Sequence, residues 1–147
     1  MYKYCLIIFL LPFFSLQEKN RFKEIYVNEN ILNEIQKYRN NSKQKGIYVI
    51  SLFTDKDENI CEIVRYKEPP TSINFVGCQL RNSDTIFLYT DKKNKFLSCY
   101  RFSGRDLYTN KKHFVNREPK EVRYYKLDTL NCLMTKIISD TNNKNPH

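Results

Sequence analysis

Five runs rich in β-branched and aromatic residues follow one another between Gly46 and Phe102, and this pattern constrains the fold most. Short polar loops separate most of the runs, which is typical of β-hairpins. Pro69 and Pro70 cannot donate to a β-ladder, so they are expected in a connection between hairpins. The pattern predicts a five-strand antiparallel meander with strands at residues 47–54, 60–66, 73–80, 85–90 and 96–102.

A helix is expected ahead of this sheet. Residues 22–27 read as a short first strand, and Asn28 or Asn30 then offers a side chain that can cap a helix. The helix should end near Asn40 and Asn41. Its apolar stripe is narrow, so the helix is expected to lie on the sheet. The stripe is formed by Ile31, Leu32, Ile35 and Tyr38.

The region after the meander is less regular. Residues 103–119 are polar and are expected to form a long loop, and residues 122–127 read as a further strand. Apolar residues then recur at helical spacing, which predicts a second helix, with a strand through Cys132 as the alternative. The expected fold class is therefore α+β: an N-terminal helix packed on a curved antiparallel β-meander of about five to six strands, with a C-terminal helix.

The first sixteen residues have the layout of a secretory signal peptide. Lys3 precedes an apolar run at residues 4–14, which is shorter than the roughly 20 residues that a membrane-spanning helix needs. A secreted or periplasmic protein is therefore expected. Its parts would be a signal peptide at 1–16, a single domain at 17–141 and a disordered tail at 142–147. Phe13 breaks the small-residue pattern of a cleavage site, so a retained membrane anchor is the alternative.

The chain is basic, with 25 Lys and Arg against 16 Asp and Glu and a formal net charge of +9. Basic proteins often bind nucleic acids, anionic glycans or membranes. Lys and Asn are abundant and Ala and Trp are absent, as an AT-rich coding sequence tends to give, so a solvated surface is the favoured interpretation. The alternative is a site for an anionic polymer, formed in two loops by Lys92, Lys93, Lys95, Lys111, Lys112 and His113.

Antiparallel pairing predicts which residues lie opposite one another. If each hairpin closes at its polar loop, one row of side chains crosses the sheet, and its face is expected to be the main core. The row runs through Phe53, Cys61, Cys78, Phe87 and Cys99. The cross-strand pairs expected are Phe53 with Cys61, Tyr66 with Ile73, Leu80 with Thr85, and Thr90 with Phe96.

The opposite face of the expected sheet is apolar as well. A sheet that is apolar on both sides must be covered on both, curl upon itself, or meet a partner. Two helices cover one face, so the other is either closed by the rest of the chain or binds a protein partner. This aromatic face includes Tyr48, Ile50, Leu52, Phe75, Ile86, Leu88, Tyr100 and Phe102.

Four cysteines lie beyond the leader, and an even count indicates disulfides in an exported protein. The expected register places Cys61 opposite Cys78 with about 4.5 to 5.5 Å between the Cα atoms, a separation that a disulfide allows. A bond between Cys61 and Cys78 is therefore predicted, with buried reduced thiols as the alternative. No CxxC pair or Cys/His cluster occurs, so no metal site and no cofactor is expected.

The sequence carries no recognisable catalytic arrangement. The two histidines are His113 in the expected loop and His147 at the end of the chain, and no GxSxG, HExxH or phosphate-loop motif occurs. The favoured hypothesis is an exported, non-enzymatic binding or interaction protein of the inhibitor or immunity kind. A binder of nucleic acid or another anionic polymer is the second hypothesis, and a hydrolase with an unrecognised site is the third.

Overall fold

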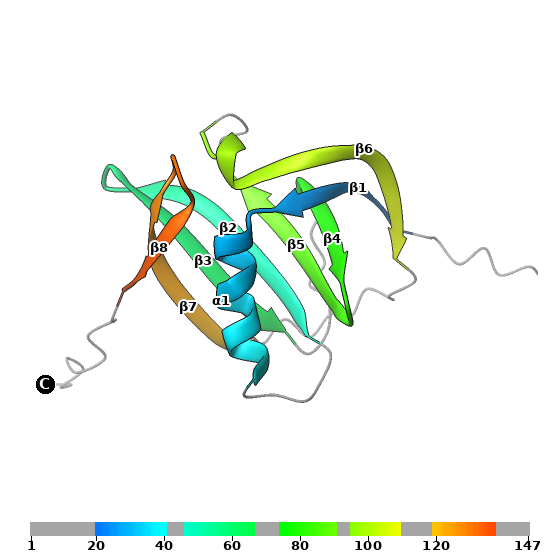
Figure 1. The fold of residues 1–147 in the computed structure, drawn as a ribbon, viewed down its shortest axis with the longest axis horizontal. Helices are drawn as coiled ribbons and strands as arrows, with labels where there is room; N and C mark the ends of the chain where they lie inside the picture. The colour runs from blue at the N-terminus through cyan, green and yellow to red at the C-terminus, as the bar shows by residue number, and fades with distance from the viewer. Residues whose placement is uncertain (1–19, 41–45, 67–73, 91–94, 110–118, 138–147) are drawn as a thin grey trace, which may run out of the picture.

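In a computed structural model of the 147-residue chain, the structure describes residues 20–40, 46–66, 74–90, 95–109 and 119–137. Within them, eight strands form one curved mixed sheet, and one α-helix packs on a face of it (Figure 1). The helical elements are α1 (Glu29–Asn40) and the 3₁₀ turn η1 (Leu97–Cys99). The strands are β1 (Asn20–Val27), β2 (Ile47–Asp55), β3 (Glu58–Tyr66), β4 (Gly77–Arg81), β5 (Asp84–Thr90), β6 (Tyr100–Thr109), β7 (Pro119–Asp128) and β8 (Leu133–Lys136).

The strand order is β6-β1-β4-β5-β2-β3-β7-β8, which corrects the expected antiparallel meander of five to six strands. Two neighbouring pairs are parallel, β1 with β4 and β2 with β5. Strand β3 pairs with β7, so it is not the neighbour of β4 that the meander required. The error has a physical cause: turn residues indicate where a hairpin closes, but they carry no information about which hairpins lie side by side.

Helix α1 begins where the sequence predicts, because Asn28 caps it. The Asn28 side-chain oxygen accepts a hydrogen bond from the N–H of Asn30 at 2.9 Å, and its backbone C=O accepts from Ile31 and Leu32 at 3.1 Å each. Ile31, Leu32 and Ile35 are buried. The prediction of this helix and of its apolar stripe is confirmed for these residues.

The hairpin of β2 and β3 forms where predicted, but its register differs by one residue. Its turn consists of Lys56 and Asp57, which both have positive φ (43° and 65°), as a type I′ turn requires. Leu52 therefore lies opposite Cys61, and the expected pairing of Phe53 with Cys61 is wrong. Because side chains alternate along a strand, this slip of one residue exchanges the two faces of β2 relative to β3.

The hairpin of β4 and β5 has the predicted register, with Leu80 opposite Thr85. Its turn places Asn82 at φ 54°, a left-handed conformation that asparagine adopts more readily than most residues. This part of the pairing scheme is confirmed.

The chain after β5 departs from the expectation in three places. Residues 97–99 form η1 and β6 pairs with β1, so the expected pairing of Thr90 with Phe96 is wrong. Strand β6 continues to Thr109, through part of the expected loop. The predicted C-terminal helix is also wrong, because β8 pairs with β7; the alternative of a strand in this region is nearer to the structure.

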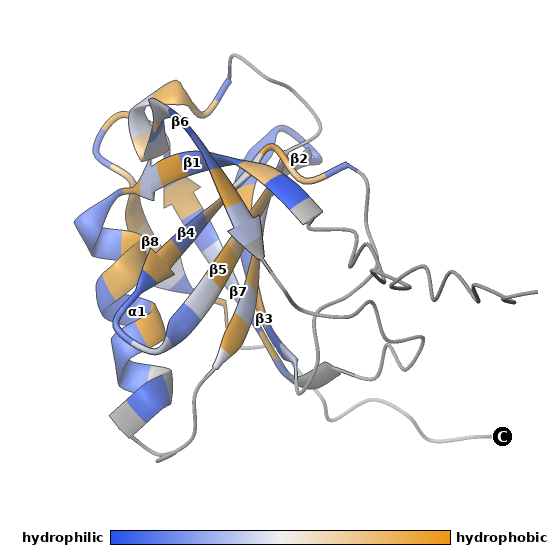
Figure 2. Cartoon of the chain, turned by 90° about the vertical axis from the view of Figure 1, so that its right-hand side faces the viewer, coloured by the Kyte–Doolittle hydropathy of each residue, from blue (hydrophilic) through white to orange (hydrophobic). Residues whose placement is uncertain are grey.

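Two apolar clusters lie on the two faces of the sheet. The larger packs beneath α1, and hydrophobic and hydrophilic stretches alternate along the elements that enclose it (Figure 2). Cys61 belongs to this cluster and Cys78 to the smaller one, so the single row expected to cross the sheet is wrong. The larger cluster includes Ile25, Ile31, Tyr48, Ile50, Leu52, Cys61, Ile63, Ile86, Leu88, Tyr100 and Tyr125. The smaller consists of Ile47, Val49, Cys78 and Phe87, with Phe22, Tyr66 and Phe75 packed against it.

The disulfide of the protein joins Cys99 to Cys132. Cys61 and Cys78 are buried thiols, which corrects the predicted bond between them and agrees with the alternative of reduced cysteines. Burial raises the pKa of the Cys61 thiol far above its ordinary value, so this sulfur stays protonated and unreactive. Beside the disulfide, Ser98 Oγ donates a hydrogen bond to the backbone oxygen of Thr129.

Candidate functional site

The predicted lysine loops are described by the structure only at Lys95. Its Nζ donates to Thr54 Oγ1 at 2.7 Å, so this ammonium contacts the end of β2. The site for an anionic polymer therefore stays a prediction. Its other residues, Lys92, Lys93, Lys111, Lys112 and His113, lie outside the described residues.

The aromatic face, for which the sequence left open either closure by the rest of the chain or a protein partner, is for the most part the main core of the protein. Tyr48, Ile50 and Leu88 have no exposed surface, and they pack in the cluster beneath α1. Phe102 of β6 differs from them, because half of its side chain (51%) is exposed. The open part of this face is therefore confined to its edge, near β6.

A groove of about 760 Å³ lies at this edge, lined by residues of β1, β6, η1 and the segment that leads into β4. We call it the β6 groove. Figure 1 shows how these strands and η1 are arranged. No described residue of α1 lines it, so the helix leaves this part of the sheet uncovered. The groove is lined by Lys23, Glu24, Asn74, Phe75, Val76, Thr90, Leu97, Tyr100, Phe102 and Gly104.

Gly77 allows β1 and β4 to approach each other closely beside the groove. A Cβ at this position would lie 2.5 Å from Ile25 Cγ2 and 2.6 Å from the backbone oxygen of Lys23, so only glycine lets β1 cross β4 this closely. The crossing is narrow, because the two strands pair at Glu24 and Cys78 alone. The groove begins beside this pairing, where Lys23 and Glu24 of β1 and Val76, next to Gly77, line it.

A bulge at Gly104 bends the other wall. The register of β1 with β6 shifts between Lys23 and Ile25, so extra β6 residues lie opposite Glu24. Gly104 has φ 84°, a conformation that glycine adopts without strain, and a Cβ added there would meet no atom within 4 Å. The bulge therefore curves β6 around the groove and leaves open space beside its backbone.

Apolar side chains form the mouth of the groove. Leu97 and Phe102 are 56% and 51% exposed, although both are large hydrophobic residues. The ring of Tyr100 is buried and packs edge-on against Phe102, with 5.7 Å between the ring centroids. Burial raises the pKa of the Tyr100 phenol, so this ring is neutral at physiological pH. Exposed apolar groups around a hollow are typical of binding sites.

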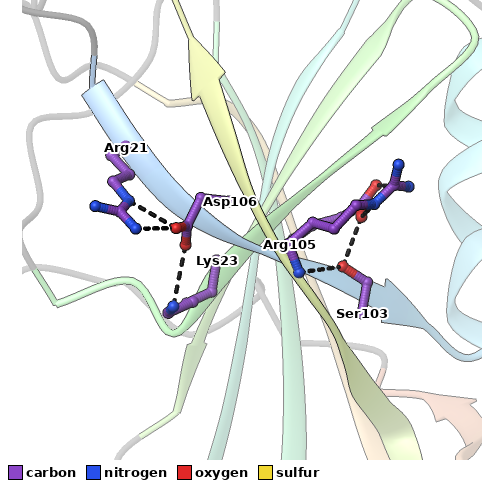
Figure 3. Close-up of polar contacts among 6 residues, drawn as sticks. Arg21, Lys23, Ser103, Arg105 and Asp106 are labelled. Carbon is purple, nitrogen blue, oxygen red and sulfur yellow. Dashed lines mark hydrogen bonds and ion pairs between the residues drawn. The ribbon is translucent and has the colours of Figure 1, made fainter.

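Two charged groups join β1 to β6 (Figure 3), and each contributes one residue, Lys23 or Glu24, to the lining of the groove. In the first, Arg21 and Lys23 both contact the carboxylate of Asp106, with 2.7 Å from Arg21 Nε and 3.1 Å from Lys23 Nζ. The hydrogen bonds from Arg21 and then from Lys23 hold the pKa of Asp106 below its usual range. The side chains of Arg21 and Lys23 are both 62% exposed, but that of Asp106 is only 18% exposed.

The second charged group is centred on Glu24. Ser103 Oγ donates to its carboxylate at 2.5 Å, and Arg105 Nε donates at 2.9 Å. The hydrogen bond from Ser103 has the largest effect in lowering the pKa of Glu24. Arg105 is 72% exposed and Glu24 13%. In both groups the cations face solvent and the carboxylates lie beneath them, so the surface beside the groove is positively charged.

A polar group at the other end of the core has a structural role. Buried Asp84 accepts a hydrogen bond from the N–H of Gly46 at 2.9 Å, and Arg39 of α1 lies 3.5 Å from its carboxylate. The pKa of Tyr48 is raised by burial and by the charge of Asp84. These contacts join the end of α1 to β2 and β5, and they lie apart from the β6 groove.

Comparisons with known proteins identified no relative of this chain. A scan against protein-family models, a search of curated proteins and a search of solved structures each gave no match. Of the helices in the described ranges, none has the length and apolar character to span a bilayer. The described residues also include no group of three or more His, Cys, Asp or Glu side chains that could hold a metal ion.

Sequence reasoning did not identify the groove. Leu97 and Phe102 were assigned to a strand and Gly104 to a loop, although an isolated glycine near β-rich residues can indicate a bulge. The larger obstacle is distance along the chain, because Arg21 and Asp106 are 85 residues apart. No local pattern shows that the first strand of the domain pairs with this segment.

Proposed function

We propose that the protein is an exported, non-enzymatic binding protein that holds an apolar part of its ligand in the β6 groove. The observation that carries this proposal is an open, mainly apolar groove of about 760 Å³ with half-exposed Leu97 and Phe102 at its mouth. Sites for small ligands usually measure about 300–1,000 Å³ and combine apolar walls with a few polar groups. The β6 groove has this size and this composition.

The polar groups of the groove favour an anionic ligand. The ammonium of Lys23 lines the groove and is 62% exposed, on the solvent side of its carboxylate partner Asp106. Thr90 and Asn74 are further polar residues of the lining. An apolar body with a negatively charged end matches this arrangement.

Titration with anilinonaphthalene sulfonate, an apolar aromatic anion, tests the proposal. Amide NMR spectra of the folded protein should show saturable shifts at Leu97, Phe102 and Gly104, because these residues line the groove. Phe102→Asp should weaken binding at least tenfold, since it places a negative charge in the apolar mouth and repels the sulfonate.

Leu130→Asp is the matched control. Leu130 is 81% exposed and lies in the turn between β7 and β8, outside the groove, so this variant should bind the anion as the unchanged protein does. Shifts scattered over the whole surface, or equal affinity of the Phe102→Asp variant, would contradict the proposal.

A further inference from the structure

We infer that the ligand of the β6 groove is a long-chain carboxylate, and that its carboxyl group binds Arg101 in a second hollow beside the groove. The inference rests on the proposed function, because the groove has to hold the alkyl chain.

The second hollow measures about 450 Å³ and is lined by residues 26–29, where β1 leads into α1, and by residues of β4, η1 and β6. We call it the Arg101 hollow. Leu97 and Tyr100 line both this hollow and the β6 groove, so the two adjoin each other. The side chain of Leu97 is 56% exposed. A flexible chain that lies in the groove can therefore bend past Leu97 into the hollow.

Arg101 gives the hollow a positive charge that the protein does not offset. Its guanidinium lies over the ring of Tyr26, 5.0 Å from the centroid, and this contact orients it. Arg105 on the same strand pairs with Glu24, whereas no carboxylate of the described residues pairs with Arg101. An arginine binds a carboxylate through two parallel N–H···O bonds, so Arg101 is suited to a carboxylate from outside the chain.

Two side-chain amides add hydrogen-bond donors to the hollow. Gln79 Oε1 accepts a hydrogen bond from the N–H of Val27 at 2.7 Å, and Asn28 Oδ1 accepts one from the N–H of Asn30 at 2.9 Å. These bonds engage the two amide oxygens, and neither NH₂ group donates to a described residue. The hollow therefore offers a guanidinium and two NH₂ groups as donors, which is a set that suits an anion.

The charges around the hollow favour a monocarboxylate. Glu29 also lines the hollow, but Arg81 Nη1 lies 3.0 Å and 3.2 Å from its two carboxylate oxygens, so these charges offset each other. One positive charge is left, that of Arg101, and one carboxylate matches it. Lys23 in the groove is a weaker anchor, because its ammonium already contacts Asp106 at 3.1 Å.

Three probes test the inference by NMR, each used below the concentration at which it aggregates: decanoate, butanoate and decanol. Decanoate should shift the side-chain NH₂ signals of Asn28 and Gln79, and also the backbone signals of Leu97 and Phe102 in the groove. Butanoate should bind at least tenfold more weakly, because its chain is too short to fill the groove. Decanol should shift the groove signals and leave the two NH₂ signals in place.

Substitutions supply the complementary test. Arg101→Gln should weaken the binding of decanoate at least tenfold more than that of decanol, because only decanoate loses a charge-assisted hydrogen bond. The matched control is Arg123→Gln on β7, which lines neither hollow and should bind decanoate as the unchanged protein does.

Three results would overturn the inference. Decanoate binding without shifts at the NH₂ groups of Asn28 and Gln79 would show that the carboxylate lies elsewhere. A larger loss of affinity in Lys23→Gln than in Arg101→Gln would place it at Lys23. Equal affinity of decanol and decanoate would show that no cation binds it. If anilinonaphthalene sulfonate binds the groove and decanoate does not, the inference fails and the proposed function stands; if neither binds, both fail.

Discussion

Cys99 and Cys132 connect the two ends of the sheet, with 5.4 Å between their Cα atoms. Cys99 immediately precedes β6 and Cys132 immediately precedes β8, and these are the first and last strands in the strand order. Two edge strands can meet in this way only if the sheet curls. The disulfide therefore holds the curvature that encloses the main core beneath α1.

Reduction of this disulfide should lower the free energy of unfolding by about 3 to 4 kcal/mol, from the loop entropy of the 33-residue separation. Urea unfolding with and without a reductant measures the difference. The double variant Cys99→Ala, Cys132→Ala should be insensitive to reductant.

Alkylation of the unfolded, unreduced chain gives an independent check. Cys61 and Cys78 should be modified, and Cys99 and Cys132 should be protected by their bond. Modification of all four would show that the disulfide is absent from the protein.

The turn of the β2–β3 hairpin predicts a stabilising substitution. Lys56 and Asp57 both have positive φ, which costs an ordinary residue roughly 1–2 kcal/mol. Lys56→Asn combined with Asp57→Gly supplies the preferred type I′ pair and should stabilise the protein by about 1 kcal/mol in urea unfolding. Asp57→Val should destabilise it, because a β-branched residue tolerates positive φ poorly. Equal stability of the two variants would show that the turn has another conformation.

Glu24 and Asp106 predict how stability depends on pH. Both have a lowered pKa in the folded protein, so the unfolded chain binds more protons in the acidic range. The stabilisation is complete above the ordinary carboxyl pKa of about 4, and it is lost as the pH falls through the lowered values. Glu24→Gln with Asp106→Asn should therefore reduce the melting temperature at pH 6 and change it little at pH 2.

Glu58→Gln is the control for this experiment, because the ion pair of Glu58 with Lys126 is more than half exposed on both sides. Thermal unfolding between pH 2 and pH 6 should show the same profile for this variant and the unchanged protein. If the Glu24 and Asp106 variants also keep that profile, the charged groups beside the groove do not stabilise the fold.

The lysine loops give a separate prediction. If they bind anionic polymers, the protein should be retained on heparin at low salt. Retention should then fall when Lys92, Lys93, Lys95, Lys111 and Lys112 are all replaced by Gln. No retention by the unchanged protein would remove this hypothesis, and it would leave the groove proposal untouched.

Local features of this fold are well predicted by the sequence. Asn28 and the apolar stripe behind it locate α1, and the polar turn near Asn82 locates the β4–β5 hairpin with its register. The β2–β3 hairpin is also located, but its register is wrong because the polar stretch 55–59 is longer than the turn it contains. Asp55 belongs to β2, whereas Glu58 and Asn59 both belong to β3, and this difference of one residue changes which side of β2 faces the core.

Long-range features are not predictable in the same way. The parallel pairing of β2 with β5 depends on how the two hairpins pack against each other. No turn or helix cap in the sequence between them indicates this pairing. The pairing of Cys99 with Cys132 follows from the curl of the whole sheet, so a scheme based on neighbouring strands selected Cys61 and Cys78 instead. The β6 groove depends on both features, which explains why the sequence did not indicate it.

The position of β1 has a consequence for how the protein folds. This strand comes first in the described chain but lies inside the sheet, where Val27 bonds to Gln79 and Arg21 to Asp106, 52 and 85 residues further on. Contacts so distant in sequence make folding slow. A chain that is still being synthesised therefore holds its first strand without the longer of its two pairings until β6 emerges, and chaperones can bind the exposed strand during that time.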